Sequence, residues 1–323
     1  MTAWNDSAGG RRARAILTSR PFLTLAMVAA VWIVASFVSR GFGAYGHLRY
    51  LVELGAVIGL VAAGQTFVVI AGGIDLSVAA IVTVSAISLP LLSWQADPTG
   101  LASVLAVLAL TTAIGVVNGL GVALLRVHPM IMTLAMATFL QGLLIIIAGG
   151  SAVTAENPLV HWLGNARPAG IPAGILLWLA VSVIVLTVMH ATPFGARIFA
   201  MGANPLAASL SGVPVTSTTL TVYGISGFTA GLAGVLVLGM NGQGYVGIGD
   251  PYLLASIAAV VLGGTSILGG LGTYAGTIPG SILLVTITAL ITVVNASPGW
   301  RSILFGSLIL GLLLLSGREQ ARR

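Results

Sequence analysis

Residues 48–77 read LRYLVELGAVIGLVAAGQTFVVIAGGIDLS, and this stretch decides the fold class. Its first part, Leu48–Ala71, is apolar almost throughout and exceeds the roughly 20 residues that a helix needs to cross a bilayer. Gly72 and Gly73 then interrupt the helix, and a second apolar segment runs from Leu76 to Trp94. The stretch therefore predicts a membrane helix, a break and another membrane helix.

The composition of the whole chain supports the same fold class. It is 57% hydrophobic and 6% charged, with a mean hydropathy of +1.08. A soluble domain carries about 25% charged residues, so the chain is predicted to be an integral membrane protein. Its apolar runs are long and continuous, whereas the strands of a membrane barrel are short and alternate. We therefore expect an all-α polytopic membrane protein.

The apolar runs predict eight to ten helices. The predicted spans are, in chain order, Pro21–Val38, Leu48–Ala71, Leu76–Trp94, Leu101–Leu125, Met130–Ala148, Ala173–Met189, Leu220–Met240, Gly276–Val294 and Ile303–Leu315. A further segment, Leu253–Leu262, is too short to cross alone. It either continues through Gly263 and Gly264 or enters the membrane and turns back, as backbone surrounded by protein can do at that depth.

Arginine sets the predicted orientation, because the chain has no lysine and a net charge of +6. Most arginines lie in the tails or at one set of helix ends: Arg11, Arg12, Arg14, Arg20, Arg126, Arg197, Arg318, Arg322 and Arg323. The positive-inside rule places these regions in the cytoplasm. We thus predict cytoplasmic tails at 1–20 and 318–323 around a membrane domain at 21–317. Basic residues that flank membrane spans do not indicate nucleic-acid binding.

Residues 194–214, FGARIFAMGANPLAASLSGVP, form a polar segment between two predicted spans. Asn204 is a favoured N-cap and Pro205 suits the first helical position. Gly212 supplies a C-terminal stop, and Pro214 prevents the helix from resuming. The segment is either an ordinary surface loop or a short capped helix that another protein grips.

Two glycine clusters interrupt the apolar segments, at 72–77 and at 263–276. Breaks in both halves are typical of internally repeated transporters. Asp75 in the first break either lines a pathway or braces the broken helix, or it caps the next helix as an N-terminal acid. The polar residues inside spans pack helices together or line a polar passage. The residues predicted to lie near a solute path are Gln65, Asn118, Thr133 and Gln141.

Several activities are excluded by residue type. The chain has no cysteine, which removes disulfides and thiolate chemistry, and no lysine, which removes the P-loop lysine. GQGYVG at 242–247 lacks the strand and helix of a dinucleotide site. GISG at 224–227 suggests a protease serine, but all four histidines precede Ser226, and that chemistry needs a later base. We predict no metal site and no enzymatic activity, so any ATPase must be a partner.

The motifs GGIDLS (72–77), GANPLAASLSGVPV (202–215) and AAVVLGGTSILGGLGTYAGT (258–277) occur in that order. With them the chain resembles, from about Leu48 to Leu315, the membrane permeases of ATP-binding-cassette sugar importers of the ribose, xylose and galactofuranose group. The resemblance implies about ten helices and a pair of identical or related permease chains. It also implies a loop at about 193–216 that docks on a cytoplasmic ATPase, which binds ATP and Mg²⁺, and a solute-binding protein on the opposite face.

The resemblance assigns residues to two structural roles. The docking-loop residues are Arg197, Gly202, Asn204, Pro205, Ala207, Ala208, Ser211 and Gly212, and the helix-break residues are Gly72, Gly73, Asp75, Ser77, Gly263, Gly264, Gly269 and Gly270. The chain departs from the family pattern at Ala79, where a glycine is usual, and at Gln141, where an arginine is frequent.

We expect an importer permease for a monosaccharide or related small polar solute in the bacterial cytoplasmic membrane. The alternatives are the same architecture for a branched-chain amino acid, a nucleoside or a signalling sugar, or a stand-alone ion-coupled carrier. A carrier would rely on ionisable residues within the membrane, for which Glu53 and Asp75 are nearly the only candidates.

Overall fold

A computed structural model describes residues 19–39, 41–92, 97–154, 156–295, 297 and 299–320. The predicted end of the third span at Trp94, the tail residues 1–18 and the tail residues 321–323 lie outside this description. The described part is helical apart from one antiparallel pair of two-residue strands, β1 (Val153–Thr154) and β2 (Gln243–Gly244).

The helices follow the apolar pattern of the chain. They are α2 (Arg20–Val38), α3 (Tyr45–Ile70), α4 (Val78–Leu91), α5 (Leu101–Ala123), α6 (Pro129–Ala148), α7 (Pro158–Asn165), α8 (Ala173–Ala191), α9 (Pro193–Ala203), α10 (Pro205–Leu210), α11 (Val215–Asn241), α12 (Asp250–Leu262), α13 (Tyr274–Val293) and α14 (Gly299–Gln320). Every predicted apolar segment is therefore a helix.

In the described part, seven helices are long and apolar enough to cross a membrane: α2, α3, α5, α6, α8, α11 and α13. By contrast, α4 has 14 residues and α12 has 13. At about 1.5 Å per residue, each reaches about 20 Å, which is less than the roughly 30 Å of a hydrocarbon core. Both short helices adjoin a glycine break. The total of about ten spans remains a prediction.

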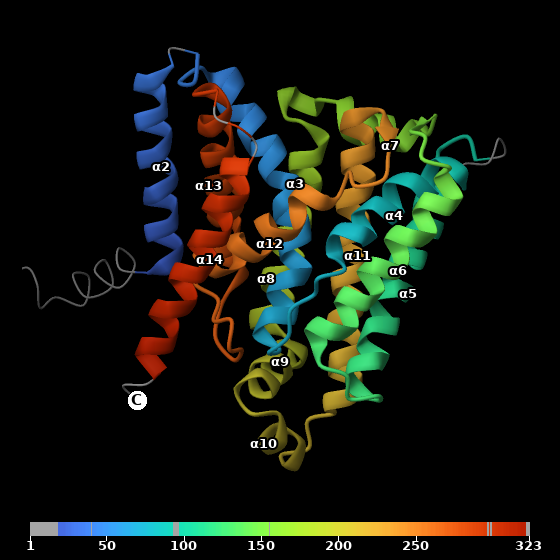
Figure 1. The fold of residues 1–323 in the computed structure, drawn as a ribbon, viewed down its shortest axis with the longest axis vertical. Helices are drawn as coiled ribbons and strands as arrows, with labels where there is room; N and C mark the ends of the chain where they lie inside the picture. Colours follow the sequence, from blue (N-terminus) through green and yellow to red (C-terminus); the bar gives the residue numbers. More distant parts are fainter. Residues whose placement is uncertain are drawn as a thin grey trace, which may run out of the picture.

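The helices α3 and α11 form the centre of the bundle, and α2 and α6 lie at its margins (Figure 1). The central helix α11 packs against α3, α4 and α5. Small residues permit this close approach: a Cβ added to Gly227 would lie 3.1 Å from the Cα of Gly115 on α5.

The two ends of the bundle differ in structure. At one end lie α9 and α10, and α2 begins and α14 ends on that same side (Figure 1). The opposite end carries α7 and the two short strands. The structure thus groups the loop around Arg197 with both described chain ends, as the arginine pattern predicts. Which side faces the cytoplasm remains a prediction of the positive-inside rule.

Candidate functional site: a docking helix, two helix breaks and a cavity

The six-residue helix α10 forms as its sequence predicts. Asn204 is its N-cap, and its Oδ1 accepts a hydrogen bond from the backbone N–H of Ala207 at 3.0 Å. Pro205 occupies the first helical position. Gly212 follows with φ 84°, a left-handed conformation that glycine adopts without steric cost and that ends the helix.

Two leucines dominate the free surface of α10. Leu206 is 70% exposed and Leu210 is 83% exposed. Because residues four apart share one face of a helix, they form a single apolar patch. The predicted docking set omits both and includes Ala208, which is 5% exposed and faces inward. A leucine pair at i and i+4 between a cap and a glycine stop is the signal that could have identified this surface.

The preceding helix α9 anchors α10 to the bundle. Thr192 caps α9 by accepting a hydrogen bond from the backbone N–H of Gly195 at 3.4 Å. Ile198 and Met201 are buried beneath it, whereas Arg197 is exposed on its outer surface. The docking segment therefore has a buried face fixed to the bundle and a free face that carries a cation and two leucines.

A buried carboxylate holds the first break, residues 72–77. Asp75 is fully buried, and its Oδ1 accepts hydrogen bonds from the N–H and the hydroxyl of Ser77 at 2.9 and 2.6 Å. Its Oδ2 accepts one from the Ser226 hydroxyl on α11 at 2.7 Å. Of the interpretations of Asp75, bracing the broken helix describes these contacts best, because they link the break to another helix.

Two of the four predicted path residues contact this same break. The Nδ2 of Asn118 donates to the Ser77 hydroxyl at 2.8 Å, and the backbone N–H of Leu76 donates to Oγ1 of Thr133 at 3.0 Å. Gln65 lies fully buried in α3, with neither amide atom hydrogen-bonded to a described residue.

Gln141 is exposed on α6, the helix that also carries the buried Thr133. The place of the four predicted residues on a solute path remains a prediction.

Backbone packing and an aromatic pair hold the second break, residues 263–273. A Cβ on Gly276 would overlap the carbonyl oxygen of Gly263, so the ends of α12 and α13 meet backbone to backbone. The hydroxyl of Tyr274 accepts from Trp178 Nε1 at 2.9 Å and donates to the Gly59 carbonyl at 2.8 Å. After α12 the chain therefore passes through the second break and continues as α13. The short helix α12 is packed within the protein.

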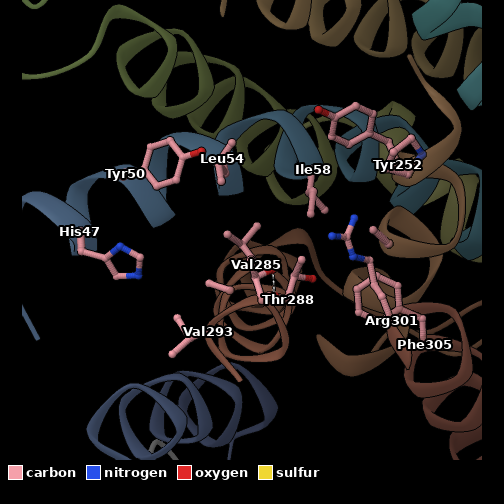
Figure 2. Close-up of a pocket in the computed structure, with 14 residues that line it drawn as sticks. His47, Tyr50, Leu54, Ile58, Tyr252, Val285, Thr288, Val293, Arg301 and Phe305 are labelled. Atoms are coloured by element: carbon pink, nitrogen blue, oxygen red, sulfur yellow. Dashed lines mark hydrogen bonds between the residues drawn. The ribbon is translucent and has the colours of Figure 1, made fainter. Parts of the chain in front are cut away.

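A cavity of about 410 Å³ lies between α3, α12, α13 and α14, towards the end opposite α10 (Figures 1 and 2). Apolar side chains such as Leu54 and Val285 form much of its wall, and none of the four predicted path residues lines it. Its polar side chains are His47, Tyr50, Tyr252, Thr288, Thr292 and Arg301. Within the described structure, Nε2 of His47 and Nε of Arg301 are buried without a hydrogen-bond partner. The cavity therefore has a mostly apolar wall with aromatic rings and a few polar side chains.

In the part of the chain that the structure describes, no group of three or more histidines and carboxylates could hold a metal ion.

Comparison with known proteins identifies the family. Residues 48–313 match the family described as branched-chain amino acid transport system / permease component. The ribose import permease protein RbsC of Escherichia coli K12 is 32% identical over 292 residues, which cover 89% of this chain and 90% of that protein. RbsC of Bacillus subtilis is 33% identical over 93% of both chains.

A third relative carries a different sugar in its name. The L-arabinose transport system permease protein AraH of E. coli K12 is 30% identical, over 92% of this chain and 90% of that protein. These matches run through both breaks and the docking segment. The chain belongs to this family of transport-system permease components.

Proposed function

We propose that this chain is the membrane permease subunit of an ATP-driven importer for a monosaccharide, in the bacterial inner membrane. The observation that carries the proposal is α10, a capped helix that presents Leu206 and Leu210 to the outside at one end of a membrane bundle. The relatives support a sugar as solute, since they are named for ribose and L-arabinose. A separate ATPase subunit binds ATP and Mg²⁺.

The alternative functions receive less support. The family description mentions branched-chain amino acids, but the relatives that cover about nine-tenths of this chain carry sugar names. A stand-alone carrier would need an ionisable membrane residue that is free to couple. Glu53 lies 3.9 Å from the Arg167 guanidinium, and Asp75 accepts hydrogen bonds from Ser77 and Ser226. Both candidate carboxylates are therefore engaged in contacts within the protein.

The ATPase docks on the exposed face of α10. Burial of a leucine side chain contributes about 1.5–3 kcal/mol, so Leu206 and Leu210 together supply enough apolar area to anchor a short helix in a cleft. Arg197 on α9 adds a charge at the margin of this surface, where charges tend to set association rate and specificity. The other predicted docking residues shape the helix and its ends.

The solute enters from the opposite end, where a solute-binding protein delivers it. The permease acts as a pair of identical or related chains. The cavity lined by Tyr50, Tyr252 and Arg301 is the part of the path that each chain contributes near that end. Deeper in the membrane, Gln65, Asn118, Thr133 and Gln141 are the proposed polar residues, and unchanged uptake after substitution of all four would remove them from the path.

The test is affinity purification of the tagged chain from mildly solubilised native membranes, followed by mass spectrometry. We expect a cytoplasmic ATPase, a solute-binding protein and a second permease chain. The double variant Leu206→Asp/Leu210→Asp should lose the ATPase and retain the second permease chain. Ser209→Asp, a charge on another exposed position of α10, is the matched control and should retain all partners.

A different result would contradict the proposed importer. Recovery of this chain alone, together with solute uptake that persists in ATP-free vesicles under an ion gradient, would replace the importer with a secondary carrier.

A further inference from the structure

The last turn of α9 lies in direct backbone contact with the second helix break and with the end of α3, just before the first break. The N–H of Gly270, in the second break, donates to the carbonyl of Ile70, the last residue of α3, at 2.8 Å. Gly202, in the last turn of α9, lies beside this hydrogen bond. A Cβ at Gly202 would overlap the Ile70 oxygen and lie 2.6 Å from the Gly270 nitrogen.

The contact is equally tight from the side of the second break. A Cβ on Gly269 would lie 2.8 Å from the Gly202 oxygen and 3.0 Å from the Gly72 Cα, and one on Gly270 would lie 2.9 Å from the Ala203 Cα. Gly269 and Gly270 also have φ 86° and 71°, so glycine is needed there for conformation as well as for space. In this region α9 contacts the second break and the end of α3, and the second break contacts Gly72 at the start of the first. We call it the three-way junction, formed by Ile70, Gly72, Gly202, Ala203, Gly269 and Gly270.

We propose that the three-way junction is the mechanical link through which α9 and α10 move both helix breaks together, with Gly202 as its positioning residue. The inference rests on the proposed function, because it takes the ATPase to dock on α10. In this proposal, the absence of a side chain at Gly202 permits the close contact through which ATP-driven movement reaches the breaks and leads to solute transport.

The geometry supports transmission because no side chain intervenes. A side chain can absorb a small displacement by changing rotamer, whereas close-packed backbones pass it on. The breaks are also where the angle between helix segments can change, since regular helical hydrogen bonding is interrupted there. Movement of α9 therefore acts directly on the second break, and it acts on the first break through Ile70 and through the contact of Gly269 with Gly72.

The test measures the amount of sugar taken up per ATP hydrolysed, and not uptake alone. The permease is reconstituted in liposomes with its ATPase and binding protein, and D-ribose and L-arabinose are used as probes. Gly202→Ala should lower sugar uptake per ATP hydrolysed by about tenfold while ATP hydrolysis continues. Gly142→Ala on α6 is the matched control, because a Cβ there meets nothing within 4 Å, and it should leave the ratio unchanged.

A second measurement keeps the proposal testable if Gly202→Ala does not assemble. Hydrogen–deuterium exchange is followed in the wild-type permease assembled with its ATPase and binding protein, with and without ATP. Amide exchange in residues 72–77 and in residues 263–273 should change together when ATP binds, because the movement reaches both breaks through the same contact.

The failures of the two proposals are distinguishable. An unchanged uptake-to-ATP ratio in Gly202→Ala, or ATP-dependent exchange that changes in only one break or in neither, would overturn the junction and leave the importer intact. A wild-type assembly that imports neither sugar in response to ATP would overturn the proposed function as a sugar importer, whatever the variants do.

Discussion

The two helix breaks meet at the same junction but are stabilised by different chemistry. The first is short and satisfies its polar groups with side chains from α5, α6 and α11, centred on the buried Asp75. The second is longer and uses its own backbone, as when the Ser266 N–H donates to the Leu271 carbonyl at 2.9 Å. Backbone groups that are removed from water must be paired within the protein, and the two breaks show two ways to do so.

The breaks also divide their helices in opposite orders. The first follows α3, of 26 residues, and precedes α4, of 14. The second follows α12, of 13 residues, and precedes α13, of 20. Internal repeats of transporters keep the order of their elements along the chain, so a long–short pair in one half and a short–long pair in the other do not match a simple repeat. The two breaks also share little sequence beyond glycine.

The largest expected effect is at the carboxylate of the first break. Asp75→Ala removes the acceptor for Ser77 and Ser226 and leaves buried donors unpaired, so it should destabilise the protein by about 3 kcal/mol or more. Thermal unfolding of detergent-purified protein measures this. Asp97→Ala is the comparison variant, because Asp97 also accepts the N–H and hydroxyl of one serine, Ser103, but is itself only half-buried, whereas Asp75 is fully buried. Equal losses in both variants would contradict the importance of burial.

At the second break the sensitive position is a glycine. Gly276→Ala places a methyl group against the Gly263 carbonyl, and backbone cannot move aside as a side chain can. The expected destabilisation is about 2–3 kcal/mol. In Gly72→Ala of the first break the new Cβ meets nothing within 4 Å, and only the φ of 88° opposes it, at about 1–2 kcal/mol. Unfolding temperatures in the reverse order would show that the second break does not depend on close backbone packing.

A smaller loss of stability is expected at the hydrogen-bonded pair of Tyr274 and Trp178. Tyr274→Phe keeps the ring and removes the hydroxyl that lies between Trp178 and the Gly59 carbonyl. The loss should be about 1–2 kcal/mol, because a buried donor and acceptor lose their partner. The Trp178 indole should also become less constrained, which a single-tryptophan variant would report by fluorescence. If neither the stability nor the fluorescence spectrum changes, the second break is stabilised by the packing of its glycines and not by this hydroxyl.

Much of this architecture could be predicted from the sequence because it is local. Apolar runs and glycine clusters predicted the helices and the breaks, and Asn204, Pro205 and Gly212 predicted α10. Long-range contacts could not be predicted in this way. Nothing near Gly202 indicates that it touches Ile70 and Gly270, since those segments are far apart in the chain.

The local sequence pattern also could not predict which way individual side chains face. Ala208 faces inward and Gln141 faces outward, and an apolar helix in a membrane gives little periodicity from which to choose, because lipid and protein interior are both apolar. Similarly, Asn118 and Thr133 could have faced a passage or a neighbouring helix. Their partners in the first break appear only when α5 and α6 are packed against it.

The smallest predicted effect is a pH dependence of stability at Asp97, which shows whether this side chain stabilises the protein through its charge. The hydrogen bond from the Ser103 backbone holds the pKa of Asp97 below its ordinary value of 3.8. Since the folded pKa is the lower one, Asp97 stabilises the protein above its ordinary pKa, and this contribution disappears as the pH falls towards the folded pKa. The unfolding temperatures of the wild type and Asp97→Asn should therefore converge in acid. A gap that stays constant from neutral to acidic pH would mean that Asp97 acts without its charge, and its comparison with Asp75 would then concern hydrogen bonds alone.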